Sequence, residues 1–169
     1  GADKMSAITD YRDRATCPLF GDGAGAVMVE GTTEEGIGMI DSYHRTDGKG
    51  LPFLHVKAGG SVCPSSSFTV DHRLHYTYQE GRTVFRYAVT AMGDDCENLL
   101  RRNGLTKDDV DYVVCHQANL RIIEAVAKRI GIPMEKVLVN IQRYGNTSAA
   151  CMPLVLWDFE SQLKKGDNI

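Results

Sequence analysis

Helical and strand-like segments alternate through the second half of the sequence, and this order restricts the fold more than any other feature. Apolar residues recur at helical spacing between Val84 and Leu100. Residues 112–115 then predict an apolar strand, residues 120–130 a second helix, and residues 137–139 a second strand. This alternation is typical of an α/β fold in which helices cover a mixed, largely buried sheet.

Capping and breaking residues mark the ends of these segments. Thr106, with Asp109 three residues later, forms a weak variant of the capping box. Gly131 ends the second helix, as glycine does after many helices. Residues 149–165 predict a last helix, in which Pro153 is tolerable only in the first turn or at a kink.

The first half of the sequence predicts strands and loops. Residues 16–20, 24–30 and 36–45 are strand-like and separated by glycine-bearing turns, which indicates a meander. Residues 46–75 are rich in Gly, Ser and Pro without a sustained period, so we expect a long excursion with a short strand near residues 53–56.

Length and charge limit the organisation and the partners. The chain has 169 residues, 43% of them hydrophobic, and no repeat or linker, so residues 1–169 predict one domain. The formal net charge of −3 gives no general attraction to nucleic acid or to an anionic membrane. No apolar run approaches the roughly 20 residues that span a bilayer, and the first residues lack a signal-peptide pattern. We therefore expect a soluble protein without nucleic-acid or membrane partners.

The five cysteines are odd in number and include no C-x-x-C pair, which disfavours a disulfide framework and a zinc site. Free thiols in a reducing cytoplasm fit this pattern best. Cys115 precedes His116 on a predicted strand, where neighbouring side chains point to opposite faces, so the two cannot pair as nucleophile and base. Cys151 lies near the start of the last helix, which favours a thiolate, but its neighbours are typical of a core.

His116 and Asn146 each follow a predicted strand, and sites in open α/β sheets gather beyond the carboxyl ends of strands. An imidazole N–H and a carboxamide N–H that converge form an oxyanion hole for a developing enolate oxygen. The alternatives are structural: a histidine at a strand end is commonly a hydrogen-bonding residue, and asparagine in Gly-Asn-Thr-Ser is commonly a turn or cap residue.

Four stretches, taken together and in this order, resemble the 3-oxoacyl-acyl-carrier-protein synthase III family, whose members have the thiolase fold. They are residues 19–26 (LFGDGAGA), 81–85 (GRTVF), 115–119 (CHQAN) and 144–149 (YGNTSA). The 30-residue separation of His116 and Asn146 agrees with that family as well.

The resemblance implies an acyltransferase with a Cys-His-Asn site that starts fatty-acid biosynthesis. A cysteine takes an acyl group from a short acyl-CoA, and malonyl-acyl-carrier protein loses carbon dioxide and condenses with it, without a cofactor or a metal. His116 and Asn146 would stabilise the enolate. In the family, the nucleophilic cysteine lies in the amino-terminal half, and none of the five cysteines here matches it. We therefore expect residues 1–169 to be the C-terminal half, without the nucleophile and the closing strands, and to be inactive alone.

Basic residues gather on one helix face after His116. Arg121, Lys128 and Arg129 share that face and Arg86 lies on the preceding helix; a solvated helix surface is the simpler interpretation. The resemblance implies instead that these four residues bind acyl carrier protein. It also implies a homodimer, and substrate contacts at Gly81, Phe85, Ala118 and Asn119.

Residues 21–25 (GDGAG) lead into an apolar strand rather than a helix, so they predict a tight turn between strands, whose glycines permit positive φ or close packing, and not a phosphate loop. Two other functions stay open. One is a carrier-binding or dimerisation module without catalysis, and the other is a related condensing enzyme that makes polyketides or quinolones.

Overall fold

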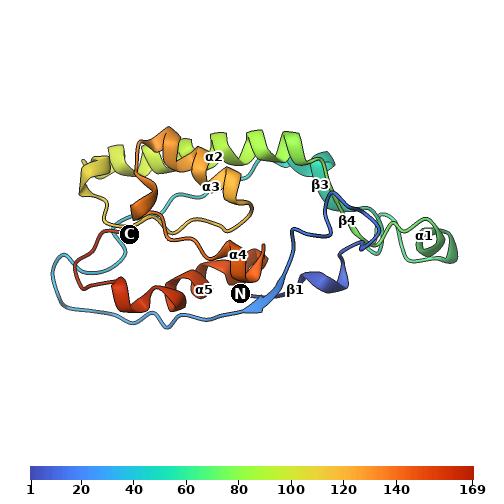
Figure 1. Ribbon diagram of the computed structural model, residues 1–169, viewed down its shortest axis with the longest axis horizontal. Coiled ribbons are helices and arrows are strands. Elements are labelled where there is room, and N and C mark those ends of the chain that lie inside the picture. The colour runs from blue at the N-terminus through green and yellow to red at the C-terminus, as the bar shows by residue number, and fades with distance from the viewer.

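A computed structural model describes all residues, 1–169, as an elongated α/β structure in which helices dominate (Figure 1). The α-helices are α1 (Ser67–Asp71), α2 (Gly81–Arg102), α3 (Leu120–Ile130), α4 (Ile141–Tyr144) and α5 (Cys151–Asp158). The strands are β1 (Ala2–Lys4), β2 (Asp22–Ala24), β3 (Leu54–Val56) and β4 (Thr77–Gln79). Short 3₁₀ helices cover Met5–Ala7, Gly48–Phe53, Lys107–Asp109, Met134–Lys136, Ser148–Ala150 and Glu160–Gln162.

The core lies between α2 and α3, which run side by side (Figure 1). α3 places Ile123 and Val126 in full burial, and α2 covers this face with its own apolar stripe. Burying such side chains contributes about 1.5–3 kcal/mol each, which fixes α3 against the rest of the chain. The core consists of Cys115, Ile122, Ile123, Val126, Ala127, Ile130, Ile132 and Val137.

The predicted helices of this region, the stop at Gly131 and the capping box are confirmed, and the structure adds a cap at Asn119. Asn119 caps α3 by accepting a hydrogen bond from the Arg121 backbone N–H, and Gly131 ends it in the left-handed conformation with φ of 69°. The capping box of Thr106 and Asp109 is present. These local signals therefore decide where the chain enters and leaves the core.

The last helix is shorter than predicted. Pro153 occupies the first turn of α5, as a proline in a helix requires, but the α-helix ends at Asp158. The next turn tightens to 3₁₀ geometry, because the Gln162 N–H donates to the Phe159 carbonyl. Asp167 then accepts a hydrogen bond from the Lys164 N–H and turns the chain away.

The predicted strands at 112–115 and 137–139 meet, but only as one parallel bridge between Val113 and Val137. The prediction of regular strands there is wrong. The Gln117 side chain donates to the carbonyls of Cys115 and Leu138, so a side chain satisfies acceptors that a longer ladder would use. The α/β class itself agrees with the structure.

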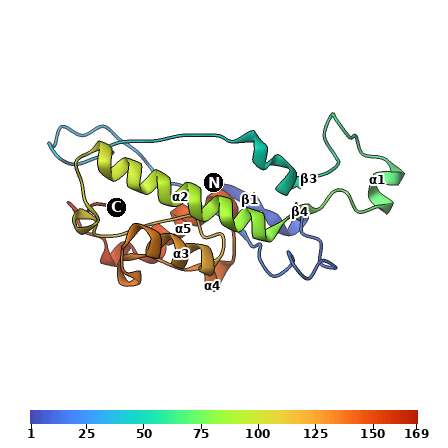
Figure 2. The ribbon, with the colours of Figure 1, turned by 90° about the horizontal axis from the view of Figure 1, so that it is seen from above.

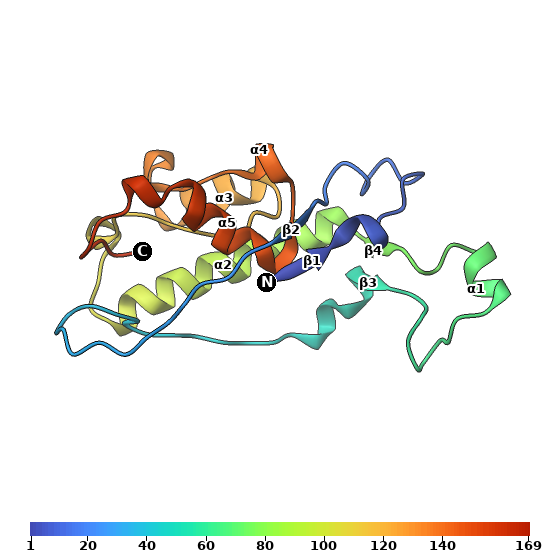
Figure 3. The ribbon, with the colours of Figure 1, turned by 90° about the horizontal axis from the view of Figure 1, so that it is seen from below.

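The predicted meander in the first half is wrong. Only β2 forms, paired antiparallel with β1, and residues 25–47 are extended without a regular ladder. Val27, Met28 and Val29 are 64%, 93% and 85% exposed, and an apolar run without a neighbouring strand cannot form a ladder. Figures 2 and 3 show this segment passing beyond the C-terminal end of α2 and returning along that helix.

The long excursion contains the short strand that the sequence predicts. β3 pairs antiparallel with β4, with Val56 opposite Thr77. α1, begun by a capping box at Ser66, projects from one end of the molecule (Figures 1 and 3). After β4 the chain enters α2, whose first turns line the candidate site described below.

Candidate active site

His116 and Asn146 line one cleft, with a volume of about 990 Å³. The start of α2 forms another wall through Gly81 and Phe85, and the loop before α3 adds Ala118. Sequence reasoning predicted that the histidine and the asparagine converge, and the structure brings both side chains to the same cleft. Asn119 completes the predicted substrate residues and lines the cleft too.

The His116 imidazole is half-buried and contacts the chain through one nitrogen only. Its Nδ1 lies 3.0 Å from the Sγ atom of Cys151, and its Nε2 makes no hydrogen bond within the protein. Burial lowers the pKa of His116, so the ring is neutral at pH 7. A neutral imidazole with a free Nε2 is therefore the group that the cleft presents.

Asn146 is held from behind by backbone bonds. Its N–H donates to the Leu19 carbonyl at 2.8 Å, and its carbonyl accepts from the Gly21 N–H at 2.9 Å, which makes a parallel bridge with the Phe20 segment. Its Oδ1 accepts a hydrogen bond from the Ser148 N–H at 2.9 Å. The side-chain NH₂ group donates to nothing in the protein, so it remains as a donor for a ligand.

Of the two roles predicted for the glycines of residues 21–25, positive φ and close packing, the structure shows close packing. A Cβ atom at Gly21 would lie 2.0 Å from the Tyr144 carbonyl oxygen, and one at Gly25 would lie 2.6 Å from Pro153. A side chain at Gly21 would push away the loop that carries Asn146, and one at Gly25 would push away the first turn of α5. β2 (Asp22–Ala24) lies within this segment, so the predicted tight turn is wrong, and no helix starts there at which to bind phosphate.

Gln117 was not singled out from the sequence, although it joins the two halves of the site. It is fully buried, and its Oε1 accepts hydrogen bonds from the backbone N–H groups of Asn140 and Ile141 at 3.0 and 3.2 Å. Its Nε2 donates to the Cys115 carbonyl at 2.9 Å. The segment after His116 is thus tied to the segment that leads into Asn146. The sequence did offer one signal for Gln117, since it directly follows a candidate histidine at the end of a predicted buried strand.

Three arginines line the cleft, and its lining includes one acidic residue, Glu80. Two of the arginines, Arg86 and Arg121, were predicted as carrier-binding residues, whereas Arg82 was missed. The sequence offered a signal for Arg82, because it lies between two predicted substrate residues in the GRTVF stretch. The excess of positive charge favours an anionic ligand at this cleft.

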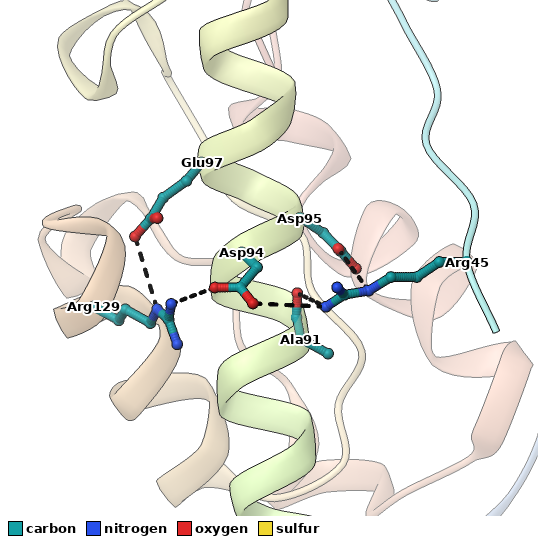
Figure 4. Close-up of polar contacts among 6 residues, drawn as sticks. All are labelled: Arg45, Ala91, Asp94, Asp95, Glu97 and Arg129. Carbon is teal, nitrogen blue, oxygen red and sulfur yellow. Dashed lines mark hydrogen bonds and ion pairs between the residues drawn. The ribbon is translucent and has the colours of Figure 1, made fainter. Parts of the chain in front are cut away.

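The other two predicted carrier-binding residues do not line the cleft. Lys128 is exposed on α3. Arg129 forms ion pairs with Asp94 and Glu97 of α2, the latter at 3.7 Å, and Asp94 also pairs with Arg45 (Figure 4). Arg129 therefore fastens α3 to α2, and its charge is partly compensated.

All five cysteines are free thiols. Burial raises the pKa of Cys115 to about 11 and also raises that of Cys151, although backbone N–H groups act in the opposite direction at Cys151. The idea that the helix start favours a thiolate at Cys151 is therefore not supported, because desolvation is the larger effect. Neither thiol is ionised at neutral pH.

The molecule contains no cluster of three or more His, Cys, Asp or Glu side chains that could hold a metal ion. None of its helices is both long enough and apolar enough to cross a membrane.

The structure is a thiolase-like α/β fold with a histidine and an asparagine in one cleft. A family model described as 3-oxoacyl-[acyl-carrier-protein (ACP)] synthase III matches residues 1–48, and the model of the C-terminal part of that family matches residues 100–169. The chain belongs to the 3-oxoacyl-[acyl-carrier-protein] synthase III family.

Curated relatives agree along the whole chain. The beta-ketoacyl-[acyl-carrier-protein] synthase III of Phocaeicola vulgatus is 68% identical over 169 residues, which are 100% of this chain and 50% of that protein. Beta-ketoacyl-[acyl-carrier-protein] synthase III 1 of Bacteroides thetaiotaomicron is also 68% identical, over the same shares. The chain therefore spans about half the length of the curated relatives that it matches.

Solved structures agree as well. The Thermus thermophilus synthase III superposes with a TM-score of 0.80 at 36% identity, over 99% of this chain and 51% of the other. Another 3-oxoacyl-(acyl-carrier-protein) synthase III gives a TM-score of 0.85 at 30% identity, over 98% and 52%. The priming beta-ketosynthase of the R1128 polyketide pathway gives 0.64 at 29% identity, over 92% and 45%.

Proposed function

We propose that this chain is the C-terminal half of a beta-ketoacyl-acyl-carrier-protein synthase III, which condenses a short acyl-CoA with malonyl-acyl-carrier protein and so starts fatty-acid biosynthesis. The observation that carries the proposal is that two groups without a partner in the protein, His116 Nε2 and the Asn146 NH₂ group, belong to residues of one cleft. Membership of the synthase III family, shown by two family models, supports it.

In the proposed reaction, the malonyl thioester loses carbon dioxide, and the electron pair of the broken C–C bond moves to the thioester carbonyl to give an enolate. The two donors stabilise the enolate oxygen where negative charge develops. The enolate carbon then attacks an acyl group held as a cysteine thioester, and that cysteine leaves as a thiolate. Neither Cys115 nor Cys151 suits this role, since both are buried and un-ionised. The nucleophile is proposed to lie in the other half.

The arginines at the cleft support the proposed partners. Arg86 and Arg121 are exposed at its edge, where they suit an acidic carrier protein and the phosphates of acyl-CoA, with Lys128 and Arg129 further along α3. Such charges steer association and weaken with salt. We expect Arg121→Glu to lower carrier affinity at low salt, measured by fluorescence anisotropy, and to leave the affinity at high salt little changed. Equal affinities at low salt would remove Arg121 from the docking surface.

The walls of the cleft suit the acyl chain and its carrier arm. Gly81 offers open space above its backbone, and Phe85 gives an apolar wall. Ala118 and Asn119 line the cleft from the loop before α3, and the Asn119 side chain is occupied as the cap of that helix. The proposed protein works as a cytoplasmic homodimer without a cofactor, with acyl-CoA as a substrate only.

The proposal is tested by His116→Ala in the full-length protein. We expect release of carbon dioxide from malonyl-carrier protein and condensation to be impaired, while self-acylation from radiolabelled acyl-CoA is retained, because the nucleophile does not depend on this imidazole. His72→Ala is the matched control, since that histidine is exposed on the far end of the molecule next to α1. Loss of acylation with normal decarboxylation would contradict the proposal.

A polyketide-priming enzyme is the second candidate, because the R1128 enzyme shares the fold. The 68% identity to two synthase III proteins favours the first candidate over this one at 29%. Primer competition separates them: a fatty-acid enzyme is expected to take acetyl-CoA or another short acyl-CoA with malonyl-carrier protein in preference to polyketide starters.

A further inference from the structure

The thiol of Cys151 lies behind the catalytic candidate His116. It is 2% exposed, and its Sγ atom is 3.0 Å from Nδ1, the ring nitrogen that points away from the open side of the ring. Cys151 is the first residue of α5, and its Sγ atom also contacts the segment that follows His116. Two segments 35 residues apart in the sequence therefore meet at one thiol–imidazole contact.

The hydrogen-bonding groups around the sulfur decide which atom carries the proton. The Gln117 N–H donates to Sγ at 3.3 Å, and the backbone N–H groups of Cys151 and Met152 also approach the thiol. These groups are donors, so they cannot receive the thiol hydrogen. The Nδ1 atom of His116 is the acceptor in contact with it.

The reverse arrangement, with Nδ1–H donating to sulfur, leaves the buried thiol hydrogen without an acceptor. It also makes Nε2 an acceptor, which would repel an enolate oxygen. Burial lowers the pKa of His116 and raises that of Cys151, so both groups are neutral and share one hydrogen on this contact.

We propose that Cys151 is a positioning residue whose S–H donates to Nδ1 of His116 and holds the imidazole in the Nε2–H tautomer, with that N–H directed into the cleft. The inference rests on the proposed function for its consequence, since the Nε2–H is the donor that meets the enolate oxygen. In this role, the hydrogen bond from Cys151 to one ring nitrogen fixes the proton on the other ring nitrogen of a functional histidine.

The first measurement is the tautomer itself, by nitrogen NMR of the full-length protein labelled at histidine, with His116 assigned by its loss in His116→Gln. We expect the proton on Nε2 in the natural protein and in Cys151→Ser, whose hydroxyl replaces the donor. In Cys151→Ala the ring is expected to populate both tautomers. Cys115→Ala is the matched control, because it removes a buried thiol of the same size with no contact to the ring.

The second measurement is malonyl decarboxylation. Cys151→Ala is expected to lower kcat by about tenfold or more with little change in KM, the scale on which losing a group that orients a working imidazole acts. Cys151→Ser should recover most of that loss. Equal rates and tautomers in Cys151→Ala and Cys115→Ala would overturn the inference, as would equal losses in the alanine and serine variants. A natural protein without any decarboxylation would refute the proposed function, while the tautomer measurement would still decide the role of Cys151.

Discussion

Replacing Gln117 by leucine removes the connection between the two segments that carry the site. The substitution nearly keeps the volume but deletes bonds of 2.9, 3.0 and 3.2 Å to the backbones of Cys115, Asn140 and Ile141, and a longer one of 3.4 Å to the Leu138 carbonyl. Each buried backbone group left without a partner costs about 1–3 kcal/mol. The three closer contacts give an expected loss of about 3–5 kcal/mol in the free energy of unfolding, since partial relaxation recovers some of it.

Urea unfolding of the full-length protein measures this loss. With a slope of about 2–3 kcal/mol per molar urea, the midpoint is expected to fall by about 1–2 M. Gln142→Leu is the matched control, because Gln142 is exposed on α4 and makes no side-chain hydrogen bond. Hydrogen exchange adds a local test, in which the amides of Asn140 and Ile141 lose protection. A free energy of unfolding within about 0.5 kcal/mol of the control's, roughly the size of an ordinary surface change, would refute the reasoning.

Two further predictions concern the glycine segment and pH. In Gly21→Ala the new Cβ would lie 2.0 Å from the Tyr144 carbonyl oxygen, so we expect the free energy of unfolding to fall by about 2–3 kcal/mol and malonyl decarboxylation to be lost. Gly31→Ala, where a Cβ would have nothing within 4 Å, should change neither. Equal unfolding midpoints in the two variants would contradict this. Because burial lowers the pKa of His116 below its ordinary 6.5, the unfolded state binds the proton more readily, and the free energy of unfolding should fall as pH drops below that value. His116→Gln should flatten this dependence in urea titrations, and an unchanged slope would count against it.

The longer helices α2 and α3 were predictable because their signals are local. The apolar stripe of α2 and the left-handed Gly131 lie within or next to the helices they define, so neighbouring residues suffice to place them. The short helices α1 and α4 were not predicted. Strands depend on partners that are distant in sequence. Val27 to Val29 have strand-like composition, but without a paired neighbour they remain extended and exposed.

The sequence predicted that His116 and Asn146 converge, which the structure shows, but not the side chains that support them. Two strand ends in an α/β pattern indicate convergence, and His116 and Asn146 do share a cleft. Alternation along a strand correctly separated Cys115 from His116, yet it says nothing about residues from other segments. The contacts of Cys151 and Gln117 arise only when α5 and the segment before α4 pack behind the histidine.

The supports of the two donors all lie on the side away from the cleft. Cys151 reaches the rear nitrogen of His116, Gln117 bonds to backbone atoms behind it, and Gly21 lets the chain approach the loop of Asn146. On the open side, His116 Nε2 and the Asn146 NH₂ group have no hydrogen-bond partner within the protein. A donor whose bonds within the protein are complete except toward the ligand needs no rearrangement when charge develops, and this preorganisation is what an enolate-stabilising site requires. Changes behind the cleft should therefore act on the rate constant of decarboxylation more than on substrate binding.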